Sequence, residues 1–150
     1  MHLRDFFSRE AISLDLTATT KDGVLAEMVG LLGVDERAQG VILRLVQRRE
    51  LLGSTGIGRG VAVPHCRSLA VNRLRVAYGR HRDGVEFSSI DQKPVTSVFL
   101  IVAPPAEVAN QYLPVLGKIA QMAKDPTVPD RLARMTTVDE FLTLLDQKGG

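Results

Sequence analysis

The chain has 150 residues, 45% of them hydrophobic and 24% charged, with a net charge of +2 at neutral pH. This composition is typical of one globular domain with a buried core, and so small a charge gives no argument for nucleic acid as a partner. The single cysteine, Cys66, excludes an internal disulfide and a cysteine metal cluster, and it suits a reducing, cytoplasmic setting. We expect no metal, no cofactor and no insertion into a membrane, because the most apolar run, 98–103, is far too short to span a bilayer.

The first fifty residues are predicted to be mainly helical. A helical turn is expected near 4–7 and a strand near 12–14. Thr19 or Thr20 can cap a first helix that Gly33 ends, and Asp35 can cap a second. Apolar residues recur in both at three- and four-residue steps, which indicates one buried face each. These positions are Val24, Leu25, Met28, Val29 and Leu32 in the first helix, and Ala38, Val41, Ile42, Leu45 and Val46 in the second.

Arg49 extends the apolar face of the second helix. It follows Leu45 by four residues and Ile42 by seven, so it points toward the side that the helix buries. Arginines in a last helical turn often do no more than offset the helix dipole. The position of Arg49 just before a glycine-rich loop, 53–60, favours a functional role, with its guanidinium emerging into a cleft.

The glycine-rich loop leads into a short apolar segment, 61–63, that stops at Pro64 and places His65 where a new loop begins. Its glycines do not have the spacing of a Walker A loop or of a Rossmann fingerprint. Ser54 and Thr55 are candidate donors to a bound anion, although the same residue types also stabilise turns.

His65 is the candidate catalytic residue. A lone histidine is usually structural or merely exposed, and nothing near His65 has the spacing of a metal ligand. Phosphoryl transfer through imidazole needs one accessible nitrogen, a hydrogen bond to the other nitrogen and nearby cations. Arg49, Arg59 and Arg67 can supply that charge. Only neutral imidazole attacks, so we expect transfer to weaken in mildly acid solution. A serine hydrolase triad has little support, because no nucleophile-elbow pattern is present.

The second half of the chain alternates strands and helices. We expect a strand at 74–79, a hairpin turn at 81–84 signalled by Asp83-Gly84, and a central strand at 95–103 covered on both faces. A helix capped by Asn110 follows, with Pro114 in its first turn, then a short helix at 129–135 and a last helix capped by Thr136 or Thr137. The core positions of the helix after Asn110 are predicted to be Leu113, Leu116, Ile119, Ala120 and Ala123.

These elements predict an α/β fold: a single-domain sandwich over residues 1–150, with a mixed central β-sheet flanked by helices. Glu50, six further residues and then Ile-Gly-x-x-Val-Ala-Val-Pro-His-Cys at 57–66 resemble the signature of the type-2 EIIA domains of the bacterial phosphoenolpyruvate-dependent phosphotransferase system. Residues 49–58, Arg-Glu-x-x-Gly-Ser-Thr-Gly-Ile-Gly, most resemble the nitrogen-regulatory branch, the EIIA-Ntr proteins. The resemblance covers nearly all of residues 3–146.

This resemblance implies a cytoplasmic phosphocarrier that works through a phosphohistidine intermediate. His65 would accept a phosphoryl group on its ε nitrogen from an HPr-like carrier protein, and Arg49 would neutralise the phosphoryl oxygens. The protein would then regulate downstream partner proteins. The chain departs from the family at Cys66, which replaces a commoner glycine with a bulkier residue and adds a thiol with a capacity to react.

A larger departure is Tyr112, which stands where the family usually carries a second histidine. A tyrosine hydroxyl can donate a hydrogen bond to a phosphoryl oxygen, but it brings no positive charge and does not readily relay a proton near neutral pH. Two alternatives to the regulatory phosphocarrier therefore stay open. One is a sugar-specific EIIA that passes phosphate to an EIIB. The other is a regulatory binding module that keeps the fold without being phosphorylated.

Overall fold

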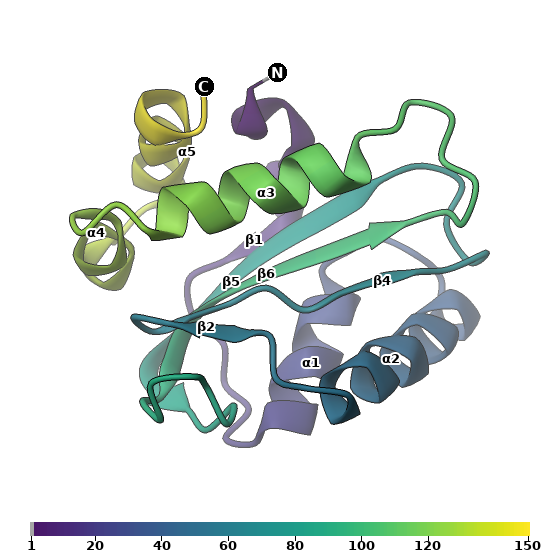
Figure 1. Ribbon diagram of the computed structural model, residues 1–150, viewed down its shortest axis with the longest axis horizontal. Coiled ribbons are helices and arrows are strands. Elements are labelled where there is room, and N and C mark those ends of the chain that lie inside the picture. The colour runs from purple at the N-terminus through teal and green to yellow at the C-terminus, as the bar shows by residue number, and fades with distance from the viewer. Residues whose placement is uncertain (1) are drawn as a thin grey trace.

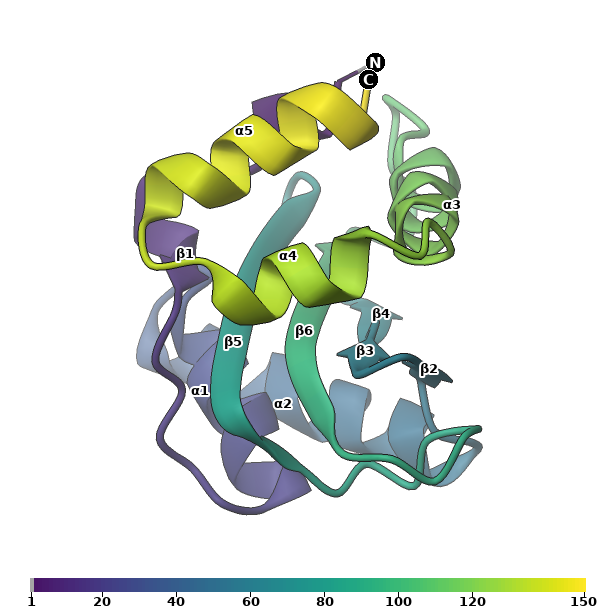
Figure 2. The same ribbon diagram turned by 90° about the vertical axis from the view of Figure 1, so that its left-hand side faces the viewer.

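The computed structural model describes residues 2–150, in which helices cover both faces of a β-sheet (Figures 1 and 2). Helices α1 (Lys21–Gly30) and α2 (Glu36–Leu51) cover one face. Helices α3 (Tyr112–Ala123), α4 (Val128–Arg134) and α5 (Val138–Lys148) cover the other. Across residues 2–150, no helix combines the length and apolarity that crossing a bilayer requires.

The sheet is mixed, with the strand order β1–β5–β6–β3–β2 and with β4 also paired to β6. Strand β5 is antiparallel to β6, whereas β3 and β4 follow one another along the other edge of β6 and run parallel to it. Two short 3-10 helices, Leu3–Phe6 and Arg9–Ala11, precede the first strand. The strands are β1 (Ile12–Ser13), β2 (Gly56–Gly58), β3 (Val61–Ala62), β4 (His65–Arg67), β5 (Arg75–Val85) and β6 (Val95–Ala103). The predicted α/β sandwich with a mixed sheet is confirmed.

Strand β6 is the centre of the molecule, and its side chains belong to two separate cores. Phe99 and Ile101 pack in the core beneath α3, α4 and α5, whereas Leu100 and Val102 pack in the core beneath α1 and α2. Successive side chains of a strand point to opposite faces, so a strand covered on both sides is apolar throughout. This confirms the central strand predicted at 95–103.

Three of the predicted helix caps are present. The side chains of Thr20, Asp35 and Thr137 accept hydrogen bonds from backbone N–H groups in the first turns of α1, α2 and α5. The donor–acceptor distances are 3.1, 2.8 and 3.2 Å, respectively. Each bond satisfies a donor that would otherwise be left unpaired at the start of a helix. Gly33 adopts φ +73° just after α1, in keeping with the predicted end of that helix.

The hairpin turn predicted at 81–84 is wrong. Residues 75–85 form a single strand, and the chain reverses later, between Val85 and Val95. Asp83-Gly84 instead lies in an irregular bulge, where the register against β6 shifts between Arg80 and Val85. Gly84 adopts φ +84°, and its N–H donates to Nδ1 of His81 at 3.0 Å. A glycine with positive φ suits a bulge as well as a turn, and here the paired residues on both sides keep the strand continuous.

The start of α3 also differs from the prediction, because a more distant side chain takes the capping role. Glu107 Oε1 accepts hydrogen bonds from the backbone N–H groups of Gln111 and Tyr112, both at 2.9 Å. Asn110 is exposed with φ +52° and does not cap the helix. The buried face differs in part from the prediction: Leu113 is 64% exposed and Tyr112 is buried. Ile119 and Ala123 are buried, as predicted.

Candidate functional site

His65 is the first residue of β4, at the edge of the sheet between α2 and α3 (Figure 1). It lies opposite Ile101 of β6, whose N–H donates to the carbonyl of Pro64 at 3.1 Å. The backbone around His65 is therefore held by the central strand, while its half-buried side chain reaches the surface. An imidazole on a rigid strand is well placed for chemistry that needs a fixed geometry.

The imidazole of His65 has a defined tautomer. Its Nδ1 lies 2.8 Å from the carbonyl oxygen of Val63. A carbonyl oxygen only accepts hydrogen bonds, so Nδ1 carries the proton and Nε2 keeps the free lone pair. The ring therefore presents its ε nitrogen as a nucleophile.

A cleft of about 390 Å³ lies beside His65. Its walls come from α2 and the residue after it, from β4 and from the first residue of α3. The described residues that line it are Leu45, Arg48, Arg49, Leu52, His65, Cys66, Arg67 and Tyr112. Three of these eight are arginines and none is a carboxylate. A positively charged cleft of this kind attracts anions.

Arg49 lies in the last turn of α2 and lines the cleft, on the side to which its helical spacing pointed. Its Nη1 donates to the carbonyl oxygen of Gly53 at 2.9 Å. This bond holds the guanidinium between the end of the helix and the glycine-rich loop. Arg49 and His65, on either side of that loop along the chain, line the same cleft.

Tyr112 faces His65 from the first turn of α3. The two ring centroids are 6.2 Å apart and the ring planes are inclined by 59°. Burial, followed by the neighbouring Cys66, raises the pKa of the Tyr112 hydroxyl to about 12, although Arg67 and Arg49 oppose the shift. The phenol is therefore neutral at physiological pH and acts as a hydrogen-bond donor rather than as a charge.

The thiol of Cys66 is part of the core beneath α1 and α2. Burial raises its pKa to about 12, so the protonated form predominates at neutral pH. Because the thiolate is the reactive species, the capacity to react that the sequence suggested is suppressed by the fold.

The structure places Ser54, Thr55 and Arg59 away from the cleft. Ser54 Oγ donates to the carbonyl of Phe87, and the Thr55 hydroxyl donates to the carboxylate of Glu50. Arg59 Nη1 donates to the carbonyl of Lys124 at 2.7 Å. These side chains fix the glycine-rich loop to neighbouring elements and do not face His65.

Glu50 holds the other end of this loop, and sequence reasoning gave it no structural role. The carboxylate is buried, accepts from the Thr55 N–H at 3.1 Å and pairs with Lys21 Nζ at 2.8 Å. The available signal was its spacing, since Glu50 lies four residues after the buried Val46 on the same face of α2. The spacing alone did not predict burial of Glu50, because charged residues are rarely buried unless they are paired.

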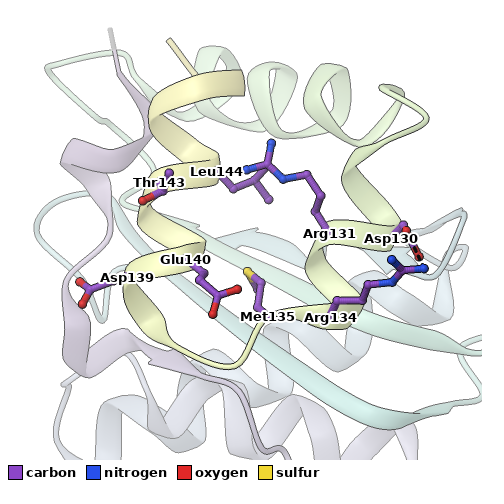
Figure 3. A pocket seen from close by; sticks show the side chains of 8 residues that line it. All are labelled: Asp130, Arg131, Arg134, Met135, Asp139, Glu140, Thr143 and Leu144. Atoms are coloured by element: carbon purple, nitrogen blue, oxygen red, sulfur yellow. Dashed lines mark ion pairs between the residues drawn. The ribbon is translucent and has the colours of Figure 1, made fainter.

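A second cavity, of about 380 Å³, lies between α4 and α5 (Figure 3). Two of its charged groups, Arg134 and Asp130, pair with each other at 3.3 Å, and the Glu140 carboxylate accepts from the Thr136 hydroxyl at 2.8 Å. It is lined by Asp130, Arg131, Arg134, Met135, Asp139, Glu140, Thr143 and Leu144. No histidine or cysteine is among these eight residues, so this cavity offers neither an imidazole nor a thiol as a nucleophile.

Residues 5–148 match the family described as phosphoenolpyruvate-dependent sugar phosphotransferase system, EIIA 2. The match covers nearly the whole chain, which therefore belongs to this EIIA family. The fold and the histidine cleft agree with the family that the sequence motif indicated, and the predicted membership is confirmed.

Within the family, the chain is similar to nitrogen-regulatory members. It is 32% identical over 136 residues to a nitrogen regulatory protein of Bradyrhizobium diazoefficiens, covering 88% of this chain and 86% of that protein. The crystal structure of nitrogen regulatory protein IIA-Ntr from Neisseria meningitidis superposes with a TM-score of 0.86 at 28% identity, covering 95% of this chain and 98% of that chain.

Sugar-specific members are similar as well. A solved complex of the mannitol enzyme IIA with phosphorylated enzyme IIB from Escherichia coli matches with a TM-score of 0.77 at 26% identity, covering 94% of this chain and 97% of that chain. The fructose-specific EIIABC component of Bacillus subtilis is 27% identical over 98% of this chain. The chain spans only 23% of the length of that relative.

Proposed function

We propose that this protein is a phosphohistidine phosphocarrier of the nitrogen-regulatory type. His65 accepts a phosphoryl group from an HPr-like carrier, and the phosphorylation state then regulates partner proteins in the cytoplasm. The observation that carries this proposal is the 2.8 Å contact between His65 Nδ1 and the Val63 carbonyl, in a cleft that also holds Arg49. A fixed tautomer with a free ε nitrogen beside a cation is what phosphoryl acceptance requires.

The transfer step follows from this tautomer. The Nε2 lone pair of His65 attacks the phosphorus of the carrier's phosphohistidine, and a new N–P bond forms as the carrier's N–P bond breaks. The electron pair of the broken bond returns to the carrier's imidazole. Nδ1 of His65 keeps its proton throughout, and the Val63 carbonyl stabilises the positive charge that the ring gains.

Two further residues act on the phosphoryl oxygens. Arg49 supplies a cation whose guanidinium is already held by the Gly53 carbonyl. Tyr112 supplies a neutral hydroxyl, which stays protonated because burial raises its pKa to about 12. Ser54 and Thr55 support the site indirectly, since they hold the loop that carries Gly53.

The regulatory role is favoured by the similarity to nitrogen regulatory proteins over most of their length. A second candidate function is the sugar-specific one, in which His65 passes the phosphoryl group to an EIIB. The observation that favours it is the similarity to a mannitol enzyme IIA solved in complex with phosphorylated enzyme IIB.

The test is to incubate the full chain with phosphoenolpyruvate, enzyme I and the HPr-like carrier, and to follow its intact mass. We expect an acid-labile phosphoryl adduct that disappears in His65→Ala and persists in His2→Ala, a control on an exposed histidine near the N-terminus. An adduct that survives His65→Ala would mean that another residue is the acceptor. If the wild type formed no adduct, the phosphocarrier proposal would be wrong, and the remaining alternative would be a binding module that is not phosphorylated. Onward transfer to an added EIIB would favour the sugar-specific role.

A further inference from the structure

Arg67 is a cleft residue to which the proposed function gives no role. It is the last residue of β4, where it pairs with Ala103 of β6. Residues two apart on a strand point to the same side and lie about 7 Å apart along it, so Arg67 and His65 share one face of β4. Both side chains line the same cleft. Arg67 therefore has direct access to the space in front of the nucleophile.

The guanidinium of Arg67 is held at two points. Its Nη1 donates to the carbonyl oxygen of Pro104 at 3.1 Å, and its Cζ lies 4.4 Å from the centroid of the Tyr112 ring. An exposed arginine normally samples many rotamers, and ordering it opposes the binding of a ligand. Stacking on a buried aromatic ring and a backbone hydrogen bond order Arg67 in advance. Pro104 takes one of its five N–H groups, which leaves others free for an anion.

The charge of Arg67 is not neutralised within the described chain. None of the ion pairs among residues 2–150 involves Arg67, and no carboxylate lines the cleft. Arg59, the other arginine downstream of Arg49 in the motif region, is directed to the carbonyl of Lys124 instead. Arg67 thus brings positive charge to the cleft from β4, opposite the charge that Arg48 and Arg49 bring from α2. A phosphoryl group carries close to two negative charges.

We propose that Arg67 is a catalytic residue of the phosphoryl transfer, a second cation that donates hydrogen bonds to the phosphoryl oxygens on Nε2 of His65. The Tyr112 ring is the platform that positions its guanidinium, and Arg49 donates to the same group from α2. This inference rests on the proposed function, since it concerns the same phosphoryl group. It assigns to Tyr112 a second task besides its hydroxyl: the face of its ring fixes the planar cation.

The experiment measures transfer from the HPr-like carrier at a series of carrier concentrations, for the wild type, Arg67→Ala, Arg67→Lys and Arg44→Ala. Arg44 is an exposed arginine of α2 outside the cleft and controls for the loss of one positive charge. We expect Arg67→Ala to lower kcat at least about tenfold, since loss of one transition-state donor commonly costs a hundredfold or more and solvent weakens an exposed one. KM should stay within about a factor of two. Arg67→Lys should recover part of kcat, because it keeps the charge and loses the planar fork.

A second readout separates contact with the phosphoryl group from a general effect. The ³¹P resonance of the phosphohistidine should shift in Arg67→Ala and stay in place in Arg44→Ala. Wild-type kcat in Arg67→Ala would overturn the inference, and so would a raised KM with unchanged kcat, which would make Arg67 a docking residue for the carrier. Circular dichroism checks that Arg67→Ala is folded. If it is not, Arg67→Gln and Arg67→Lys are compared with the wild type in its place. Absence of any adduct on the wild type would remove the proposed function itself, whereas a normal Arg67→Ala rate would remove this inference alone.

Discussion

The carbonyl oxygen of Val63 lies 2.8 Å from Nδ1 of His65, two residues further along the chain. A backbone acceptor this close fixes which nitrogen of the ring carries the proton. It comes from the segment that Pro64 ends, so the residues before His65 do more than place it at the end of a strand. They also set its protonation pattern, and through it the nitrogen that reacts.

The first prediction concerns this tautomer. ¹⁵N-detected NMR of the unphosphorylated protein should show His65 with its proton on Nδ1, and the phosphoryl group should appear on Nε2 after transfer. His81 provides an internal control, because its Nδ1 accepts from the Gly84 N–H and its proton must then lie on Nε2 when the ring is neutral. Phosphorylation of His65 at Nδ1 would contradict the assignment.

The second prediction concerns the Tyr112 hydroxyl. Tyr112→Phe should slow transfer from the carrier about tenfold, the equivalent of one hydrogen bond of about 1.4 kcal/mol. The measurement is the rate of formation of the phosphoryl adduct on the intact protein.

The pH dependence of this effect has a defined sign. The pKa of Tyr112 is raised to about 12, so the hydroxyl remains a donor throughout the range between about pH 7 and pH 10. The ratio of wild-type to Tyr112→Phe rates should therefore stay constant across that range. A ratio that fell toward one on the alkaline side would show that the phenol ionises there.

The third prediction concerns Cys66. Its pKa is raised from 9.0 to about 12 by burial, so alkylation of the native protein near pH 8 should be far slower than that of the urea-unfolded chain. The folded state also holds this proton more tightly than the unfolded state does. Stability from this source is complete below about pH 9 and declines as the pH rises from there toward about 12.

Denaturant melts across this alkaline range check the second half of the Cys66 prediction. Cys66→Ala should show a smaller loss of stability between about pH 9 and pH 10, because only the wild type has this thiol to ionise, while the tyrosines contribute equally to both proteins. Rapid alkylation of the native wild type would contradict the burial of the thiol.

The fourth prediction concerns the buried pair of Lys21 and Glu50. The Glu50 side chain is 4% exposed and that of Lys21 is 24% exposed. Removing one partner of a shielded pair leaves a poorly solvated charge, so Glu50→Ala should destabilise the fold by about 2–4 kcal/mol in urea unfolding. The double variant Lys21→Met, Glu50→Gln should recover part of the loss, because no unpaired charge remains.

The control for the buried pair is Asp15→Asn. It breaks the pair of Asp15 and Arg82, whose side chains are exposed and 3.6 Å apart, and should change the stability by less than about 1 kcal/mol. If Glu50→Ala and Asp15→Asn lowered the free energy of unfolding equally, the buried Glu50 carboxylate would contribute no more to stability than an exposed ion pair does.

The sequence by itself determined the features that depend on neighbours along the chain. The caps at Thr20, Asp35 and Thr137 act on N–H groups three residues away, and the continuous apolar run of β6 requires cover on both faces. The helical spacing of Arg49 predicted the face of α2 on which it lies. The motif around His65 indicated the family.

Only the tertiary structure decided which of several polar partners a residue takes. The Asp83-Gly84 signal became a bulge because β6 pairs with the residues on both sides of it, and Asn110 lost the capping role to Glu107. The side chains of Ser54 and Arg59 donate hydrogen bonds to the backbone carbonyls of Phe87 and Lys124, which are distant in sequence. They therefore lie outside the cleft. The side chain of Arg67 lies in the cleft, where it contacts the Tyr112 ring and donates to the Pro104 carbonyl. Hydrogen-bond capacity is a local property of the sequence, but the nearest partner is set by the packing of elements that are far apart along the chain.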